Sequence, residues 1–197
     1  NFKKQVIENK KELLCNRGSL NSIEDGKNGI SLRIKLSGES CPKGAAALVK
    51  FDVVSVSRIR FSVETAPDNM LDALIMNYAT NKGESFYGLG EQFAYLDFKG
   101  KNLPILVAEQ GQGRHRPDLD VWPLQVRGDW FTTYAPVPNY LTKNYHGLFL
   151  YNDEYNEFSF KNDTSPSIKV WANKMSGEIN WSTSYKGLID EYMKATG

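Results

Sequence analysis

The chain has 197 residues, of which 24 are Lys or Arg and 23 are Asp or Glu, so its formal net charge is +1. A nearly neutral chain has no long-range field that attracts nucleic acid, so nucleic acid is not an expected partner. Hydrophobic residues make up 41% of the chain, but no apolar run approaches the roughly 20 residues that a membrane-spanning helix needs. The length suits one sizeable domain, and it excludes a β domain of this size combined with a (β/α)8 barrel of about 250 residues.

Aromatic residues account for 12% of the chain, and this composition favours β-structure. The first clear strand pattern covers residues 30–36, where apolar and polar residues alternate and place Ile30, Leu32, Ile34 and Leu36 on one face. We expect this face to be buried. The run 48–63 repeats the pattern and is long enough for one strand or for two joined by a bulge or a bend.

Further strands are expected in five segments bounded by Gly, Pro, Asn or Asp, namely 85–87, 130–134, 146–152, 157–161 and 167–172. Many strands at short spacing predict an all-β fold, a two-sheet β-sandwich. Residues 67–79 have a spacing that also suits a short helix, so their state stays open. After Ser184 the apolar residues recur at helical spacing and predict a helix over residues 184–196.

Cys15 and Cys41 are the two cysteines of the chain. They could form one disulfide or remain two free thiols. A disulfide would favour a secreted protein or a secretory compartment, and free thiols would favour the cytoplasm. The triplets that begin at Asn162 and Asn180 match the acceptor sequence for N-glycosylation, which matters only in a secretory pathway.

Residues 86–117 are denser in Gly, amide, acid and base than the rest of the chain. Seven of their polar side chains could bond a hydroxyl-rich ligand such as a sugar: Glu91, Gln92, Glu109, Gln110, Arg114, His115 and Arg116. Four aromatic side chains could offer flat apolar faces: Phe86, Tyr87, Phe93 and Tyr95. In the structural alternative, Glu91 and Gln92 satisfy buried loop backbone and the arginines are solvated.

Other chemistry is less well supported by the sequence. Gly88 and Gly90 lack the third glycine and the following helix of a phosphate-binding motif, so a tight β-turn is expected there. His115 and His146 are the two histidines, and no cluster of Cys or acids accompanies them at metal-ligand spacing. Neither a metal nor a cofactor is therefore expected.

Two pairs of acids could be considered as catalytic groups within the chain. Asp118 and Asp120 would share one face of a strand, and Glu91 and Glu109 flank the polar stretch. Neighbouring surface acids are more typical of a solvated turn than of a nucleophile with its acid, so neither pair is expected to be catalytic.

Four stretches of the sequence form a recognisable set: YGLGEQF at 87–93, EQGQGR at 109–114, TYAPVP at 133–138, and the terminal residues 188–197. Together they resemble the N-terminal domain of glycoside hydrolase family 31, in the branch that contains the bacterial sulfoquinovosidases. Residues before 86 resemble this family only in their strand pattern. The resemblance implies a galactose-mutarotase-like supersandwich over residues 1–183. It also implies that residues 184–197 form a helix leading toward a catalytic (β/α)8 barrel that is not in this chain.

Family members are retaining α-glycosidases, in which a nucleophile and an acid stand about 5 to 5.5 Å apart. The resemblance places both carboxylates on the barrel, so no catalytic residue is expected here. It implies instead an accessory domain that packs on the barrel and lends a loop to the substrate pocket. The expected partners are the carbohydrate substrate and the barrel of the same polypeptide. The alternative is a free-standing carbohydrate-binding module without catalysis.

The same resemblance implies roles for the loop residues. Substrate binding would fall to Glu109, Gln110, Gln112 and Arg114, although Arg114 could instead lock the loop by pairing with Glu91 or Glu109. Six residues would shape the loop: Gly88, Gly90, Glu91, Gln92, Gly111 and Gly113.

Overall fold

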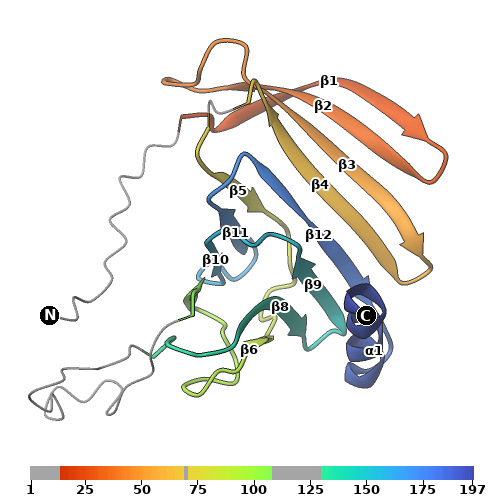
Figure 1. Ribbon diagram of the computed structural model, residues 1–197, viewed down its shortest axis with the longest axis vertical. Coiled ribbons are helices and arrows are strands. Elements are labelled where there is room, and N and C mark those ends of the chain that lie inside the picture. Colours follow the sequence, from red (N-terminus) through yellow and green to blue (C-terminus); the bar gives the residue numbers. More distant parts are fainter. Residues whose placement is uncertain (1–13, 69–70, 108–129) are drawn as a thin grey trace, which may run out of the picture.

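The computed structural model describes residues 14–68, 71–107 and 130–197 (Figure 1). In these residues twelve strands form two antiparallel sheets, and a helix follows them. The predicted all-β sandwich with a C-terminal helix is therefore confirmed.

The larger sheet has eight strands in the order β1-β2-β3-β4-β12-β9-β8-β6. Their bounds are β1 Arg17–Gly26, β2 Gly29–Ser37, β3 Ala46–Ser55, β4 Arg58–Ala66, β12 Lys174–Trp181, β9 His146–Leu150, β8 Pro136–Thr142 and β6 Phe86–Gly90. The smaller sheet has four strands in the order β5-β11-β10-β7. Their bounds are β5 Leu74–Asn77, β11 Ser167–Val170, β10 Asn156–Ser159 and β7 Asn102–Ile105.

The core lies between the smaller sheet and the middle of the larger one. Fully buried side chains from β4, β12 and β9 meet those of the smaller sheet, namely Phe61, Met175, Leu148 and Leu150 against Leu103, Phe158, Ile168 and Val170. Aromatic rings extend this core, and the ring centroids of Phe86 and Phe160 lie 4.1 Å apart. The burial of these side chains fixes how the sheets face each other.

The expected burial of one face of β2 is only partly confirmed. Its aliphatic side chains do share a face, but Ile30 remains 41% exposed. In Figure 1, β1 and β2 lie to one side of the smaller sheet, which packs over β4, β12 and β9 instead. The alternation of residues therefore predicted the strand correctly, but not how much of its apolar face is buried.

Three other expectations are resolved by the structure. The run 48–63 forms two strands, β3 and β4, joined at Val56 and Ser57. Residues 67–79 contain the strand β5 and no helix among those described. The strand expected at 130–134 is wrong, because in that segment only Thr133 pairs, in a single bridge with Val107.

The helix α1 spans Tyr185–Thr196 and begins where the sequence predicts. Ser184 is its N-cap, and the Ser184 hydroxyl accepts a hydrogen bond from the amide of Gly187 at 3.1 Å. Leu188 is buried, and Tyr192 packs edge-on against Phe149 of β9 at 5.1 Å between ring centroids. Among the described residues no helix is long and apolar enough to cross a membrane.

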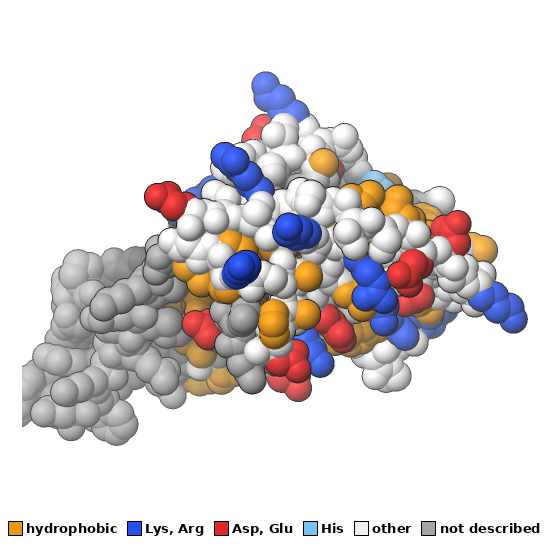
Figure 2. Space-filling view, turned by 90° about the horizontal axis from the view of Figure 1, so that it is seen from above, with side chains coloured by type: hydrophobic (Ala, Val, Ile, Leu, Met, Phe, Trp, Pro, Cys, Tyr) orange, Lys and Arg blue, Asp and Glu red, His pale blue; other side chains and the backbone are white. Residues whose placement is uncertain are grey.

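Cys15 and Cys41 form a disulfide, which ties the residues before β1 to the connection between β2 and β3. Of the two alternatives for these cysteines, the structure therefore has the bridged one. On the face shown in Figure 2, acidic and basic side chains are interspersed with small apolar areas.

Candidate functional site

The first part of the candidate site is an irregular stretch of β6. Gly88, Leu89 and Gly90 have φ angles of +105°, +60° and +85°, and the pairing of β6 with β8 shifts register between Gly88 and Gly90. The expected tight β-turn is therefore wrong: these residues form a bulge within a paired strand. A Cβ on Gly90 would lie 2.1 Å from the carbonyl oxygen of Ala135, so only glycine permits this close approach.

The residues after the bulge are held by hydrogen bonds to backbone carbonyls. The amide of Glu91 donates to the carbonyl of Ala135 at 2.9 Å, and its own carbonyl accepts from the hydroxyl of Thr133 at 2.5 Å. The side-chain amide of Gln92 donates to the carbonyl of Leu89 at 2.9 Å. Gln92 thus satisfies backbone, as the structural alternative expected, while the carboxylate of Glu91 belongs to an exposed residue.

Asp97 fastens the residues after the bulge to the start of β6. One of its carboxylate oxygens accepts hydrogen bonds from the amides of Phe86 at 3.0 Å and Lys99 at 2.9 Å. Burial acts to raise the pKa of Asp97, but these donors and the hydroxyl of Ser85 hold the pKa below its usual range. The charged form of Asp97 is therefore the one that fastens this connection.

The residues on either side of segment 108–129 lie together at this bulge. Val107 and Thr133 form a parallel bridge, and Thr133 is buried, with its hydroxyl also accepting from the amide of Ala135 at 3.2 Å. We call the bulge, Glu91, Gln92, Val107 and Thr133 the loop base.

The proposed sugar-binding residues lie outside the described residues. They are Glu109, Gln110, Gln112, Arg114, His115 and Arg116. The loop-shaping Gly111 and Gly113 and the acids Asp118 and Asp120 also lie outside the described residues. What the structure brings together is Gly88, Gly90, Glu91 and Gln92, beside Thr133, which in turn forms the bridge with Val107.

Large apolar side chains remain exposed around the loop base. They are Phe93 at 54%, Tyr95 at 43%, Leu96 at 81%, Val107 at 63% and Tyr134 at 52%. The ring of Tyr95 packs edge-on against Trp130 at 5.3 Å, and the ammonium of Lys101 lies 4.1 Å from its centroid. Clustered exposed apolar groups are typical of an interaction surface. Phe86, considered as a sugar-stacking ring, is instead buried in the core.

A groove of about 630 Å³ runs from the loop base to α1. It is lined by residues 105–107, 136–138 and 149–156 and by Tyr192 of α1. We call it the α1 groove. Apolar and aromatic side chains dominate its lining, with Asn152, Asp153, Glu154 and Asn156 as polar members. Sequence reasoning missed this groove because its walls come from four separated segments.

A buried ionic network fixes the strands beside α1. The Glu178 carboxylate accepts from the guanidinium of Arg60 and from the hydroxyl of Tyr151, at 2.8 Å and 2.6 Å, and lies 3.4 Å from Arg58. Arg58 also lies 3.4 Å from Glu191 of α1. Burial acts to raise the pKa of Glu178, but Tyr151 and the two arginines hold it below its usual range. Because Tyr151 lines the α1 groove, the network supports that wall.

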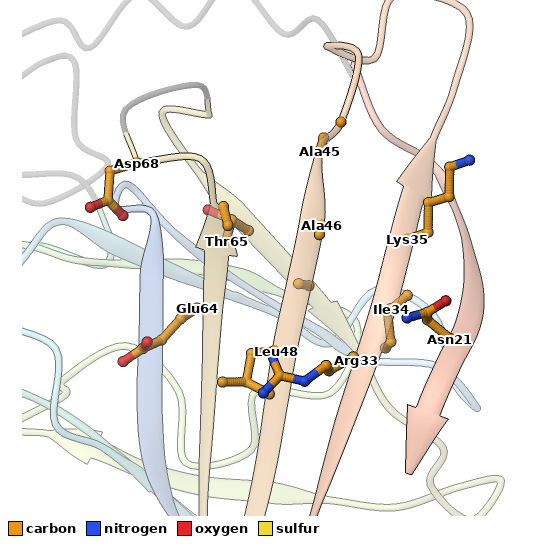
Figure 3. Close-up of a pocket in the computed structure, with 13 residues that line it drawn as sticks. Asn21, Arg33, Ile34, Lys35, Ala45, Ala46, Leu48, Glu64, Thr65 and Asp68 are labelled. Carbon is orange, nitrogen blue, oxygen red and sulfur yellow. The ribbon is translucent and has the colours of Figure 1, made fainter. Parts of the chain in front are cut away.

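A second hollow, of about 500 Å³, lies on β2, β3 and β4 (Figure 3). Its lining includes the small side chains of residues 44–47 and the charged residues Arg33, Lys35, Glu64 and Asp68. In Figure 3 these four charged side chains are spread along the walls and do not converge on one point. The hollow therefore lacks the convergent polar groups of a ligand site. In the described parts of the chain, no group of three or more His, Cys, Asp or Glu side chains is placed to hold a metal ion.

Comparison with known proteins gives sequence relatives at moderate identity, while no family model matches the chain. The sulfoquinovosidase of Escherichia coli K12 is 26% identical over 143 residues, which are 70% of this chain and 21% of that protein. The sulfoquinovosidase of Agrobacterium fabrum C58 is 29% identical over 112 residues, which are 55% of this chain and 17% of that protein. The matched part is thus about a fifth of each curated relative.

Solved structures have the same fold. A family 31 sulfoquinovosidase from E. rectale, in complex with an aza-sugar inhibitor, matches 91% of this chain and 26% of its own, with a TM-score of 0.77 and 23% identity. A cycloalternan-forming enzyme from Listeria monocytogenes, in complex with a pentasaccharide substrate, matches 91% of this chain with a TM-score of 0.67 and 13% identity. Together these similarities confirm the expected resemblance and relate the chain to the carbohydrate-processing enzymes of glycoside hydrolase family 31.

Proposed function

We propose that this chain is the N-terminal accessory domain of a retaining α-glycosidase, of the α-glucosidase or sulfoquinovosidase type. In this proposal the sandwich packs on a catalytic barrel and presents residues 109–114 to the substrate. The observation that carries it is the loop base: Val107 and Thr133 hold both ends of segment 108–129 beside a bulge that only glycine allows.

The exposed apolar side chains around the loop base support the proposal that a partner domain covers this surface. Five large apolar side chains remain exposed there, and the α1 groove continues this surface to the helix that would lead into the barrel. An accessory domain needs such a patch, because its partner removes the patch from water. A free-standing module would instead have to expose the same patch permanently.

The domain would contribute to the reaction by binding and by excluding water. Retaining hydrolysis requires a nucleophile and an acid, which the barrel would supply. Glu109, Gln110 and Gln112 would accept and donate hydrogen bonds to sugar hydroxyls, while Gly111 and Gly113 permit close approach of the backbone. Arg114 would either contact the bound sugar or fasten the loop by pairing with Glu91 or Glu109.

The test compares this chain with a longer polypeptide of the same gene that includes the proposed barrel. Both are incubated with an aryl α-glucoside and an aryl α-sulfoquinovoside, and release of the aryl group is measured. We expect turnover by the longer polypeptide and none by the chain alone. Hydrolysis by the chain alone would contradict the proposal, and micromolar binding of maltose by the chain in calorimetry would favour the free-standing module.

A further inference from the structure

We propose that Asn162 is an acceptor for N-linked oligosaccharide and that Asn180 is not. Both begin an Asn-x-Ser/Thr triplet, so the sequence alone does not distinguish them. Their positions in the fold are opposite, because Asn162 lies in an exposed connection between β10 and β11 and Asn180 lies within the central strand β12.

Asn162 is exposed, and its side chain is already held in a turn. Its carbonyl oxygen accepts from the amides of Thr164 and Ser165, both at 3.1 Å, and lies 3.4 Å from the hydroxyl of Thr164. The side-chain nitrogen makes no hydrogen bond within the described part of the chain. This arrangement presents the nitrogen to solvent with the Thr164 hydroxyl beside the same amide group.

The connection that carries Asn162 is firmly attached to the sandwich. The Asp163 carboxylate accepts from the ammonium of Lys99 at 2.9 Å and from the amide of Gly83 at 3.1 Å. The carbonyl of Thr164 accepts from the amide of Thr80 at 3.1 Å. The acceptor triplet is therefore presented in one conformation without partial unfolding.

Asn180 is only 4% exposed. Its strand, β12, is paired on both sides, and Asn180 lies opposite Arg58 on β4 and Gly147 on β9. Its side-chain oxygen would be 2.2 Å from a Cβ on Gly147, so the amide fills the space that this glycine leaves. No room remains there for an oligosaccharide in the folded protein.

The disulfide is an independent observation that favours the secretory pathway, where N-linked oligosaccharide is transferred. Cys15 and Cys41 are bonded, and stable disulfides form in oxidising environments such as the lumen of the secretory pathway. Transfer of N-linked oligosaccharide takes place on chains that enter such a pathway.

An oligosaccharide on Asn162 would also leave the candidate site open. Residues 152–155, which line the α1 groove, precede β10, and Asn156 of the same lining begins it, whereas Asn162 follows β10. Ile105 of β7, next to the loop base, pairs with Asn156 at the start of β10. The groove and the loop base thus lie at one end of the smaller sheet and Asn162 lies beyond the other end.

The reaction requires a sugar donor, for which we name an oligosaccharide linked to a lipid through pyrophosphate. The side-chain nitrogen of Asn162 forms a bond to the anomeric carbon, and the bond from that carbon to the pyrophosphate oxygen breaks. The nitrogen loses one proton to the base of the transferase, and the lipid pyrophosphate leaves. No oxidant or reductant is involved.

The test is the intact mass of the protein secreted by a eukaryotic cell and of the protein isolated from its source. We expect one oligosaccharide, at Asn162, which peptide-N-glycosidase removes with conversion of that asparagine to aspartate. Thr164→Ala should abolish the mass increment, whereas Thr164→Ser and Asn180→Gln should retain it. Thr164→Ala keeps the two backbone contacts of Asn162, so its loss of sugar would not reflect misfolding.

Two results would overturn the proposal. One is an unmodified Asn162, or a modified Asn180, in secreted protein whose disulfide is formed. The other is source protein with free thiols and no sugar. These outcomes are independent of the glycosidase assay, so failure of either proposal would be recognised separately.

Discussion

Glu178 on β12 and Arg60 on β4 form a two-point contact, in which one carboxylate oxygen accepts from Nε at 3.1 Å and from Nη2 at 2.8 Å. The two strands are adjacent, and Glu178 lies directly opposite Arg60 in their register. The side chain of Glu178 is 3% exposed while that of Arg60 is 52% exposed, so the arginine joins a buried charge to the surface. Removing the carboxylate would leave Arg58, whose side chain is 14% exposed, without this partner.

We therefore expect Glu178→Ala to lower the free energy of unfolding by about 1.5 to 3 kcal/mol, because the hydrogen bonds that Tyr151 and Arg60 donate to a charged group are lost while Arg58 keeps Glu191. The measurement is urea unfolding at pH 7. Glu24→Gln is the matched control, since Glu24 and Arg33 form an exposed pair at 2.9 Å that should contribute no more than about 1 kcal/mol. Equal effects of the two variants would show that the buried network contributes no more to stability than an exposed ion pair.

The network around Glu178 should also make the free energy of unfolding depend on pH. The pKa of Glu178 is lower in the folded chain than its usual value of about 4.3, so folding favours the charged carboxylate. This contribution is fully present above the usual pKa and is lost as the pH falls through the folded pKa. We expect the stability difference between the native chain and Glu178→Gln to be constant from pH 7 to pH 5 and to shrink below pH 4. A difference that grows on acidification would contradict this assignment.

Gly90→Ala should destabilise the fold more than Gly100→Ala. Both glycines have positive φ, at +85° and +76°, so both variants incur the cost of about 1 to 2 kcal/mol for a side chain in that region. A Cβ on Gly100 meets nothing within 4 Å, whereas one on Gly90 meets the backbone of Ala135 and Val137. We expect Gly90→Ala to cost about 1 to 3 kcal/mol more, measured by urea unfolding. Equal costs would mean that the approach of β6 to β8 is not tight.

Reduction of the disulfide should lower stability without abolishing the fold. The bond closes a loop with a sequence separation of 26, for which chain entropy predicts about 3.5 kcal/mol of stabilisation at 25 °C. We expect Cys15→Ser with Cys41→Ser to lower the melting temperature and to leave the circular dichroism spectrum of a β protein. The native chain in reductant should behave as the variant does, and an unchanged melting temperature would indicate that the bond closes no flexible loop.

Glu109→Gln in the longer polypeptide tests the proposed sugar contact. Loss of a charge-assisted hydrogen bond of about 1.5 to 3 kcal/mol should lower kcat/KM roughly 10- to 150-fold, with the melting temperature nearly unchanged. Glu39→Gln makes the same chemical change at an exposed position in the connection between β2 and β3 and should leave kcat/KM unaltered. Unchanged kinetics with a large fall in melting temperature would assign Glu109 to the scaffold.

The strands that the sequence predicted well are those with one apolar and one polar face. β2 and the β3–β4 pair satisfy this condition, and so does the capped helix α1. β7 and β8 were missed because they contain prolines; β7 tolerates Pro104 as the edge strand of the smaller sheet. β12 was missed although Met175, Gly177 and Ile179 alternate with polar residues, since Glu178 and Asn180 are buried by partners far away in the sequence.

The candidate site was predictable only as a local motif. The glycines at 88 and 90 indicated unusual backbone angles. Glycine suits both a turn and a bulge paired to β8, so the sequence did not distinguish the two. The α1 groove and the Val107–Thr133 bridge depend on contacts between separated segments, which a single sequence does not reveal. Residues 109–114 remain predictions made from their resemblance to family 31.

The bridge between Val107 and Thr133 joins the two ends of the segment that lies between them in the sequence. Because this bridge already joins the two ends, doubling the length of that segment would cost only about 0.6 kcal/mol in closure entropy. New residues could be inserted there, or the whole segment exchanged between relatives, while the core contacts that stabilise the sandwich stay the same. Changes of length or sequence in this segment would therefore leave the fold of the sandwich intact.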